Sequence, residues 1–448
     1  MSLACRPDET SPYVRAFLAD RGLEPSSLDL AIDGRDEMLG FLLDGLEGDR
    51  DKALFAYFRS GLSVADGLLQ VLRWRFPRGL GKVLDFASGY GRITRFLVRE
   101  IPPERLWVAD VYEGGVRFQE ERFGVHGLVS TVRPEELDLG ETFDAILVTS
   151  LFTHLPEERF LAWLRVLLGR LDPGGVLAFS THDPGLLVPC PPLPESGLLF
   201  QEISESGSLD TRDYGSTWVT EAFVRGAVAR VAGSIGRSAS IHRLERGLCD
   251  YQDLYVAVLE PDVDFSGLRY TGEPYLSLER CRILGSGELE MSGWATLRTG
   301  EVQAVEVVLD GRLLAELRVA YQRPDVAGST GEPRNLHSGW GGTFALPPGT
   351  SHGSAVLLIR VRDGRGVSHL LRAGSVESLL LESARNEVSV LKRELWTSGE
   401  RLSELQARAD ADIGALRARI AAMEASRFWK MRNAWFRLKR GLGLTRED

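Results

Sequence analysis

Short apolar runs alternate with longer amphipathic segments along residues 83–180. The runs have the length and composition of strands that are buried on both faces of a parallel sheet. They lie at 83–86, 106–110, 127–132, 143–150 and 176–180. Helical spacing of apolar residues between the runs predicts helices over 92–100, 115–123 and 157–171. Two further runs, at 234–244 and 254–259, fit an antiparallel hairpin, so the pattern predicts an α/β fold with seven strands.

The first predicted strand ends in a turn of small residues. Val83–Phe86 is followed by Ala87-Ser88-Gly89-Tyr90-Gly91 and then by a helical segment. Gly89 and Gly91 would let backbone N–H groups approach a ligand where a Cβ would collide. Asp85 could accept a hydrogen bond from a ligand amine or fix the turn through its N–H groups. Open parallel sheets bind ligands outside the carboxyl ends of their strands, which is where this turn lies.

Four features in order resemble class I S-adenosylmethionine-dependent methyltransferases. They are the turn at 85–91, an acid at the end of the second strand (Asp110), the fourth strand, and the turn Leu171-Asp172-Pro173-Gly174-Gly175 before the fifth. The dinucleotide pattern G-x-G-x-x-G is not met, because Thr94 occupies the third glycine position. The resemblance covers about 60–262 and implies a Rossmann-like sheet with S-adenosylmethionine as cofactor. It places these residues at the cofactor: Asp85, Ala87, Ser88, Gly89, Gly91, Asp110, Val111, Thr131 or Val132, and Ser150.

Catalytic candidates must lie beyond the ends of strands four and five. A sugar hydroxyl is a poor nucleophile that needs a base, and His154 follows strand four directly before a helix. The alternative is that His154 only caps or packs the helix entry. His182 with Asp183 could form a carboxylate-oriented base, and Tyr214 could line the acceptor pocket. No metal-binding constellation is visible, although His182 and Asp183 could contribute to one.

The remainder of the chain predicts four further parts. Residues 1–60 have the apolar spacing of amphipathic helices. These helices either pack against the rest of the domain or form a lid over the entrance to the cofactor and substrate site. Residues 263–373 have regularly spaced strands with Asp-Gly turns, which predicts a β-sandwich. Motifs in it resemble the small immunoglobulin-like modules of bacterial glycan-processing enzymes, which implies a carbohydrate- or partner-binding module or a spacer. Residues 376–425 show a heptad pattern with one slip, which predicts a coiled coil and a homo-oligomer.

Residues 426–448 reverse the charge of the chain. Six Lys and Arg residues and no acid lie between 427 and 440, whereas the whole chain has a net charge of −10. Aromatic residues at spacings of three and four share one helical face, which is typical of a helix at an anionic membrane surface. A partner protein or the chain's own acidic surface is the alternative. The tail resembles those of bacterial surface-polysaccharide enzymes, whose acceptors are lipid-linked glycans.

Composition narrows the possible partners and the cellular location. The negative net charge argues against a nucleic-acid partner. Four widely spaced cysteines favour a reducing compartment, and the sequence lacks a spanning apolar run and a signal peptide. We therefore expect a cytoplasmic protein that is peripheral to the inner membrane.

The expected activity is O-methylation of a sugar in a cell-surface polysaccharide or its lipid-linked precursor. One alternative is a methyltransferase that acts on a small molecule or a protein and uses its tail only for oligomerisation. Another is a scaffold of a glycan-assembly complex without enzymatic activity.

Overall fold

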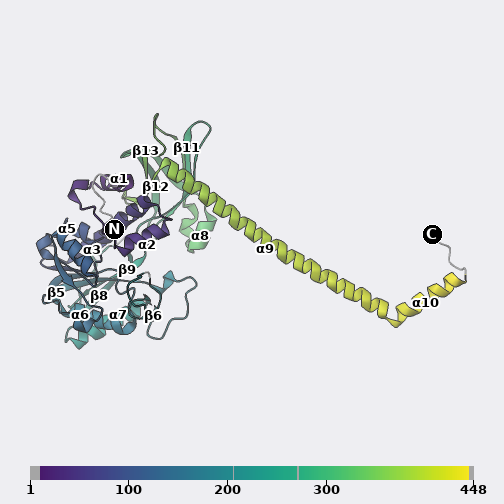
Figure 1. Ribbon diagram of the computed structural model, residues 1–448, viewed down its shortest axis with the longest axis horizontal. Coiled ribbons are helices and arrows are strands. Elements are labelled where there is room, and N and C mark those ends of the chain that lie inside the picture. The colour runs from purple at the N-terminus through teal and green to yellow at the C-terminus, as the bar shows by residue number, and fades with distance from the viewer. Residues whose placement is uncertain (1–10, 205, 270–271, 443–448) are drawn as a thin grey trace. The chain divides into compact units, whose positions relative to one another are not determined.

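The computed structural model describes residues 11–204, 206–269 and 272–442. The chain divides into two compact units, residues 1–380 and 381–448, and each is described by itself (Figure 1). Cys5, the first ten residues of the predicted N-terminal helical segment and the last six of the basic tail lie outside the described residues. The predicted boundaries within 1–380, at 61–262 and 263–373, stay predictions.

The first unit contains a mixed sheet of seven strands in the order β3-β2-β1-β4-β5-β9-β8. The five strands from β3 to β5 are parallel, and β9 pairs antiparallel with both β5 and β8. The bounds are β1 Val83–Phe86, β2 Leu106–Asp110, β3 His126–Val129, β4 Phe143–Val148, β5 Leu171–Thr181, β8 Ser240–Leu248 and β9 Gln252–Val258. This arrangement confirms the predicted Rossmann-like core.

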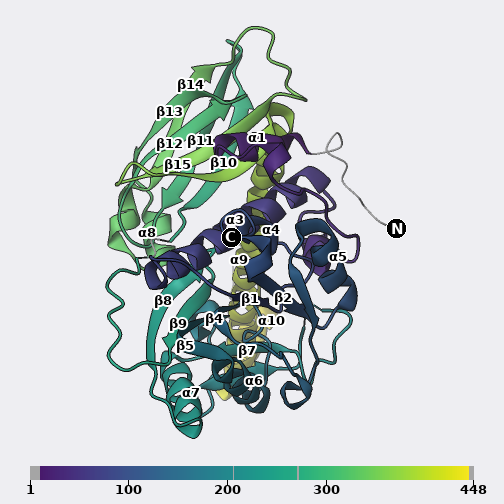
Figure 2. The same ribbon diagram turned by 90° about the vertical axis from the view of Figure 1, so that its left-hand side faces the viewer.

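Helices cover both faces of this sheet because its central strands are apolar on both sides (Figure 2). Val83 and Ala145 face α3 and α4, whereas their neighbours Leu84 and Ile146 face α6 and α7. The helices of this part are α1 Pro12–Asp20, α2 Glu37–Gly45, α3 Arg50–Arg75, α4 Thr94–Leu97, α5 Glu113–Phe123, α6 Glu157–Gly169 and α7 Glu221–Ser234. Two short strands between β5 and α7 form a separate antiparallel hairpin: β6 Leu198–Gln201 and β7 Ser216–Val219.

A second sheet of seven antiparallel strands follows in the order β10-β11-β14-β13-β12-β15-β16. Its strands are β10 Tyr275–Ile283, β11 Glu288–Thr296, β12 Val302–Leu309, β13 Arg312–Tyr321, β14 Gly339–Ala345, β15 Val356–Asp363 and β16 Ser368–Ser375, with α8 at Pro324–Thr330. Both ends of this order contribute to one apolar core, in which Met291 and Ile359 are fully buried. The predicted sandwich of two separate sheets is not confirmed, since the strands join in one order through a short β13–β14 pairing.

Hydrogen bonds and ion pairs join this sheet to the N-terminal helices. The hydroxyl of Tyr13 on α1 accepts a hydrogen bond from the backbone N–H of Ser375 at 3.0 Å. Arg360 on β15 pairs with Asp20 at 3.0 Å, and Arg59 on α3 pairs with Glu273 at 2.6 Å. The N-terminal helices therefore contact both sheets.

The heptad segment forms one helix, α9, over Val376–Ala425. Its first turn is buried in the second core through Val376 and Leu379, whereas every residue from 384 to 425 is exposed. A second helix, α10, covers Arg427–Gly441 and is capped by the Ser426 hydroxyl, which accepts from the Trp429 N–H. The pairing of α9 into a coiled coil stays a prediction.

Three predicted element boundaries are wrong. The helix expected over 92–100 is only α4, because the backbone from Val98 to Glu100 leaves the helix as irregular turns. The strand expected from 234 begins at Ser240, since α7 continues to Ser234. The turn expected at 172–175 lies within β5. Strand β10 was not predicted.

Asp85 begins a chain of hydrogen bonds that holds the turn after β1. Its Oδ2 lies 2.8 Å from the Thr94 hydroxyl oxygen, which lies 2.7 Å from Gln119 Oε1. Gln119 in turn donates through Nε2 to the Ser88 hydroxyl and the Gly89 carbonyl, both at 2.9 Å. One hydroxyl proton cannot serve both Asp85 and Gln119. A protonated Asp85 that donates to Thr94, which then donates to Gln119, gives each of these two contacts its own proton.

Burial agrees with a protonated Asp85. The side chain is fully buried, and this burial raises its pKa from 3.8 to about 7. Between these values the folded chain holds a proton that the unfolded chain has released, so stability falls as pH rises through this interval.

We predict that Asp85→Asn removes part of this pH dependence. An amide donates to Thr94 at any pH, so the melting temperature of the variant should fall less than that of the parent between pH 4 and 7. Circular dichroism melting curves across this range measure the difference, with the exposed-site variant Asp262→Asn as the control. Equal slopes for all three proteins would contradict a protonated Asp85.

Candidate active site

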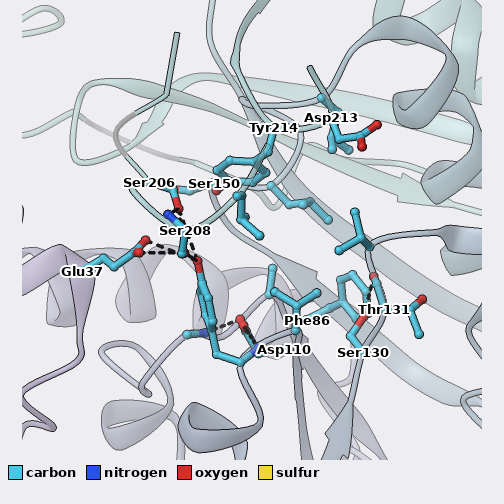
Figure 3. A pocket seen from close by; sticks show the side chains of 18 of the residues that line it. Glu37, Phe86, Asp110, Ser130, Thr131, Ser150, Ser206, Ser208, Asp213 and Tyr214 are labelled. Carbon is cyan, nitrogen blue, oxygen red and sulfur yellow. Dashed lines mark hydrogen bonds between the residues drawn. The ribbon is translucent and has the colours of Figure 1, made fainter. Parts of the chain in front are cut away.

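A cavity of about 580 Å³ opens at the carboxyl ends of the parallel strands. Its lining comes from the turns after β1, β2, β3 and β4, the start of α2, α6, and the segment before β7. Figure 3 shows Asp110 and Phe86 on one side of this cavity and Tyr214 with Asp213 on the opposite side. The size is within the range of small-molecule and cofactor sites.

Asp110 fixes the side of the cavity next to the sheet. Its Oδ2 accepts from the Gly89 N–H at 2.7 Å, and its Oδ1 accepts from the Tyr112 N–H at 3.0 Å. Each oxygen keeps a further lone pair for a ligand hydroxyl. Burial raises the pKa of Asp110, while the two backbone donors lower it. Val111 also lines the cavity.

The turn after β1 brings backbone to the cavity. Gly89 has a left-handed φ of +57°, and a Cβ built there would meet no protein atom within 4 Å. Ala87 and Ser150 line the same cavity with φ of 60° each, which is an uncommon conformation for residues with a Cβ. Such strained backbone is concentrated at functional sites. The Ser150 N–H donates to the Ser180 hydroxyl at 2.8 Å, which holds the second strained position.

Thr131 and Val132 line the side of the cavity beyond β3. The Ser130 N–H donates to the Asp110 carbonyl at 2.8 Å, which ties this segment to the end of β2. The Thr131 hydroxyl donates to the Arg133 carbonyl at 2.7 Å, and Val132 is half exposed. The predicted adenine-side residues therefore lie in the cavity wall.

Three distant segments meet at another wall (Figure 3). The Tyr112 hydroxyl lies 2.6 Å from the Ser208 hydroxyl and donates to Glu37 at 3.4 Å. Ser208 donates to the other Glu37 oxygen at 2.9 Å. Glu37 is the first residue of α2, so an N-terminal helix does contribute to the cavity mouth.

The side opposite Asp110 is polar and aromatic. Tyr214, Asp213 and Arg159 line it together. Arg159 on α6 pairs with Asp213 at 3.5 Å and with Glu135 at 3.7 Å.

His154 lies behind Tyr214 and does not line the cavity. Its ring stacks on the Tyr214 ring with centroids 4.4 Å apart, and its Nδ1–H donates to the Gly215 carbonyl at 2.7 Å. Burial lowers the pKa of His154, so the ring is neutral at pH 7.

His182 and Asp183 do not form the expected pair. His182 is buried outside the cavity lining, and this burial lowers its pKa to about 4. Asp183 pairs instead with Arg243 at 2.8 Å and accepts from the Gly185 N–H at 2.7 Å. The prediction that Asp183 orients His182 is therefore wrong.

Three predicted cofactor residues of the turn do not line the cavity: Asp85, Ser88 and Gly91. Gly91 is required for packing, since a Cβ there would lie 2.5 Å from the Phe123 ring. The cavity is also lined by residues that were not predicted from the sequence: Glu37, Tyr112, Ser208, Arg159 and Asp213. Only Tyr112 carried a signal, because it follows Asp110 by two positions.

Two features are absent from residues 11–204, 206–269 and 272–442. No group of three or more His, Cys, Asp or Glu side chains in this range is arranged to hold a metal ion. No helix within the same range is long and apolar enough to cross a membrane.

The chain is similar to several solved structures. It is similar to an S-adenosylmethionine-dependent methyltransferase from Clostridium acetobutylicum ATCC 824, at 12% identity and a TM-score of 0.35, over 49% of this chain and 97% of that one. It is similar to the sugar N-methyltransferase KedS8 from Streptoalloteichus sp. ATCC 53650, at 18% and 0.32, over 45% and 88%. The plantazolicin methyltransferase BpumL, in complex with SAH, matches at 11% and 0.33, over 50% and 95%.

The sequence itself was also compared with curated proteins and with family models. No curated protein matches the chain. Residues 84–177 match the family model described as a methyltransferase domain. That segment runs from β1 into β5 and includes the turns around Gly89 and Asp110. The matched domain makes this chain a methyltransferase with S-adenosylmethionine as its methyl donor.

Proposed function

We propose that this methyltransferase O-methylates a sugar of a cell-surface polysaccharide, or of its lipid-linked precursor, at a membrane surface. The observation that carries the proposal is that Tyr214 and Asp213 lie on the side of the cavity opposite Asp110, with Arg159 paired to Asp213. An aromatic ring beside an acid and a guanidinium offers a sugar an apolar face and several hydrogen-bonding partners.

The sheet side of the cavity suits the methyl donor. S-adenosylmethionine supplies an electrophilic methyl group on its sulfonium. In our proposal Asp110 accepts from the ribose hydroxyls, and Ala87, Gly89 and Val111 bound the nucleoside. Thr131 and Val132 face the adenine, and Ser150 lies under the methionine part. Asp85, Ser88 and Gly91 support this side through the hydrogen bonds and packing of the turn.

The opposite side would position the acceptor. Tyr214 contacts the acceptor. His154 positions Tyr214, because it stacks on the Tyr214 ring and donates a hydrogen bond to the Gly215 carbonyl. Arg159 and Asp213 bind acceptor hydroxyls. Orientation of the acceptor hydroxyl toward the methyl group then supplies much of the rate. The earlier hypothesis that His154 is the base is the alternative to this positioning role.

Helix α10 suits a membrane surface. Phe428, Met431 and Trp435 lie at helical spacing and are 73%, 70% and 57% exposed. Arg432 lies over the Trp429 and Phe436 rings at 4.6 and 5.2 Å, which keeps charge beside aromatic groups. Exposed apolar residues with adjacent cations match the surface of a bilayer that contains anionic lipids.

A second candidate function keeps the same chemistry with a different acceptor. A small molecule or a protein could fill the cavity, and the tail would then serve oligomerisation only. The exposed apolar residues of α9 are compatible with oligomerisation under either candidate function. The membrane experiment therefore decides between the two candidate functions.

We predict that Asp110→Asn weakens S-adenosylmethionine binding by roughly 10- to 100-fold, because a charged acceptor for two hydroxyls is lost. Isothermal titration calorimetry measures the dissociation constant. The exposed Asp310→Asn variant is the matched control, and circular dichroism checks that both proteins fold. An unchanged dissociation constant in folded Asp110→Asn would contradict the ribose role.

We predict that His154→Phe keeps kcat within about 10-fold of the parent, because a phenyl ring can still stack on Tyr214. Loss of a general base would instead lower the rate by about 10²- to 10⁴-fold. His154→Ala, which removes the ring, should raise KM for the acceptor. Steady-state methyl transfer measures both constants, and a collapse of kcat in His154→Phe alone would identify His154 as the base.

We predict methyl transfer from radiolabelled S-adenosylmethionine into glycan lipids fractionated from the source cell. Deletion of 426–448 should abolish flotation with anionic vesicles and reduce transfer to vesicle-bound glycan lipids, while transfer to the released soluble glycan stays unchanged. Neutral vesicles are the control for charge. Label in protein or small-molecule fractions, or unchanged flotation after the deletion, would favour the second candidate function.

A further inference from the structure

Helix α9 exposes a continuous apolar seam. At 50 residues it is about 75 Å long, and isolated helices in water gain little from propensity alone. Leu395, Leu402 and Leu416 are each more than half exposed although they lie on the heptad seam. A helix of this kind is stabilised when a partner helix covers the seam.

The heptad positions are assigned from the seam. Before the slip, position a is occupied by Leu381, Val388, Leu395 and Leu402, and position d by Ala384, Leu391, Ser398 and Leu405. After an insertion of four residues at 409–412, position a is Ile413 and Ile420 and position d is Leu416 and Met423. Val or Ile at a with Leu at d, as in the pairs 388/391 and 413/416, favours two parallel strands.

Charges beside the seam also select a parallel arrangement. In a parallel dimer in register, each g residue faces the e residue five positions later on the other chain. This rule pairs Glu387 with Lys392, Asp412 with Arg417, and Arg419 with Glu424, and each pair has opposite signs. The remaining e and g positions of 387–424 place no like charges opposite each other.

An antiparallel arrangement would separate all three pairs. Antiparallel helices bring g against g and e against e, so a dimer that places Leu395 opposite Leu416 would bring Lys392 near Arg417. These two like charges are unfavourable there. The partner that fits the seam is therefore a second copy of the same helix in the same direction.

We propose that α9 is the interface of a parallel, in-register homodimer, in which the three charge pairs set direction and register. The two α10 helices then leave the same end of the dimer. Two copies of a weak surface-binding helix on one particle bind a vesicle more tightly than one, because the second contact is intramolecular. This interface does not depend on the proposed function.

The test uses two charge variants of the full chain. One variant carries Glu387→Lys, Asp412→Arg and Arg419→Glu, and the other carries Lys392→Glu, Arg417→Glu and Glu424→Arg. In a parallel dimer each variant alone places like charges at all three pairs, whereas an equal mixture restores opposite charges at every pair. A control variant with Arg393→Glu, Glu400→Arg and Glu404→Arg reverses three charges that point away from the seam.

Sedimentation equilibrium gives the result. The parent and the control should have twice the chain mass of 49.5 kDa, each variant alone should dissociate at least 10-fold more readily, and the mixture should regain the parent's dimer. A monomeric parent, a trimer or larger oligomer, or a mixture no tighter than its components would overturn the proposal.

Disulfide trapping tests direction separately. Leu416→Cys at a d position should cross-link two chains on mild oxidation only when the helices are parallel and in register. Cys5 and the exposed Cys190 are changed to Ser in this variant, so that neither can form the cross-link. A dimer by mass that does not cross-link through this position would contradict the parallel register.

Discussion

The chain of hydrogen bonds from Asp85 through Thr94 and Gln119 to the Gly89 carbonyl holds the turn on which the cavity depends. A buried acid is costly when ionised, and a neutral Asp85 can donate to the Thr94 hydroxyl. The same turn donates the Gly89 N–H to Asp110, so the buried chain and the cavity wall share one loop. Two carboxyl groups thus have separate tasks: Asp85 holds the backbone from below, and Asp110 faces the ligand space.

The different positions of Asp85 and Asp110 explain which parts of the site could be predicted from the sequence. Apolar runs identified the parallel strands because central strands are buried on both faces, and an acid at the end of β2 could be placed at the edge of the sheet. The depth of Asp85 could not be predicted, since one residue along a short strand decides whether a side chain faces ligand or core. Only the packed Thr94 and Gln119 reveal which way it points.

The rest of the cavity was not predictable for a different reason. The wall formed by Glu37, Tyr112 and Ser208 joins segments 75 to 171 positions apart, and no local pattern encodes such a meeting. For His182 and Asp183, by contrast, a local pattern suggested a contact that the structure does not contain. Their adjacency suggested a pair, but neighbouring residues at a strand end point in different directions, and Arg243 takes the carboxylate.

Helices α9 and α10 follow simpler rules, because beyond the buried first turn of α9 both are described by their period and their charges. Their exposed apolar residues cannot be satisfied within 381–442, since α9 is a single helix and α10 is too short to cover it. Apolar surface of this extent implies partners. The two helices differ in charge: α9 mixes both signs in a pattern that complements itself, whereas α10 carries only cations and cannot pair favourably with its own copy. A like helix therefore suits the first, and an anionic surface suits the second.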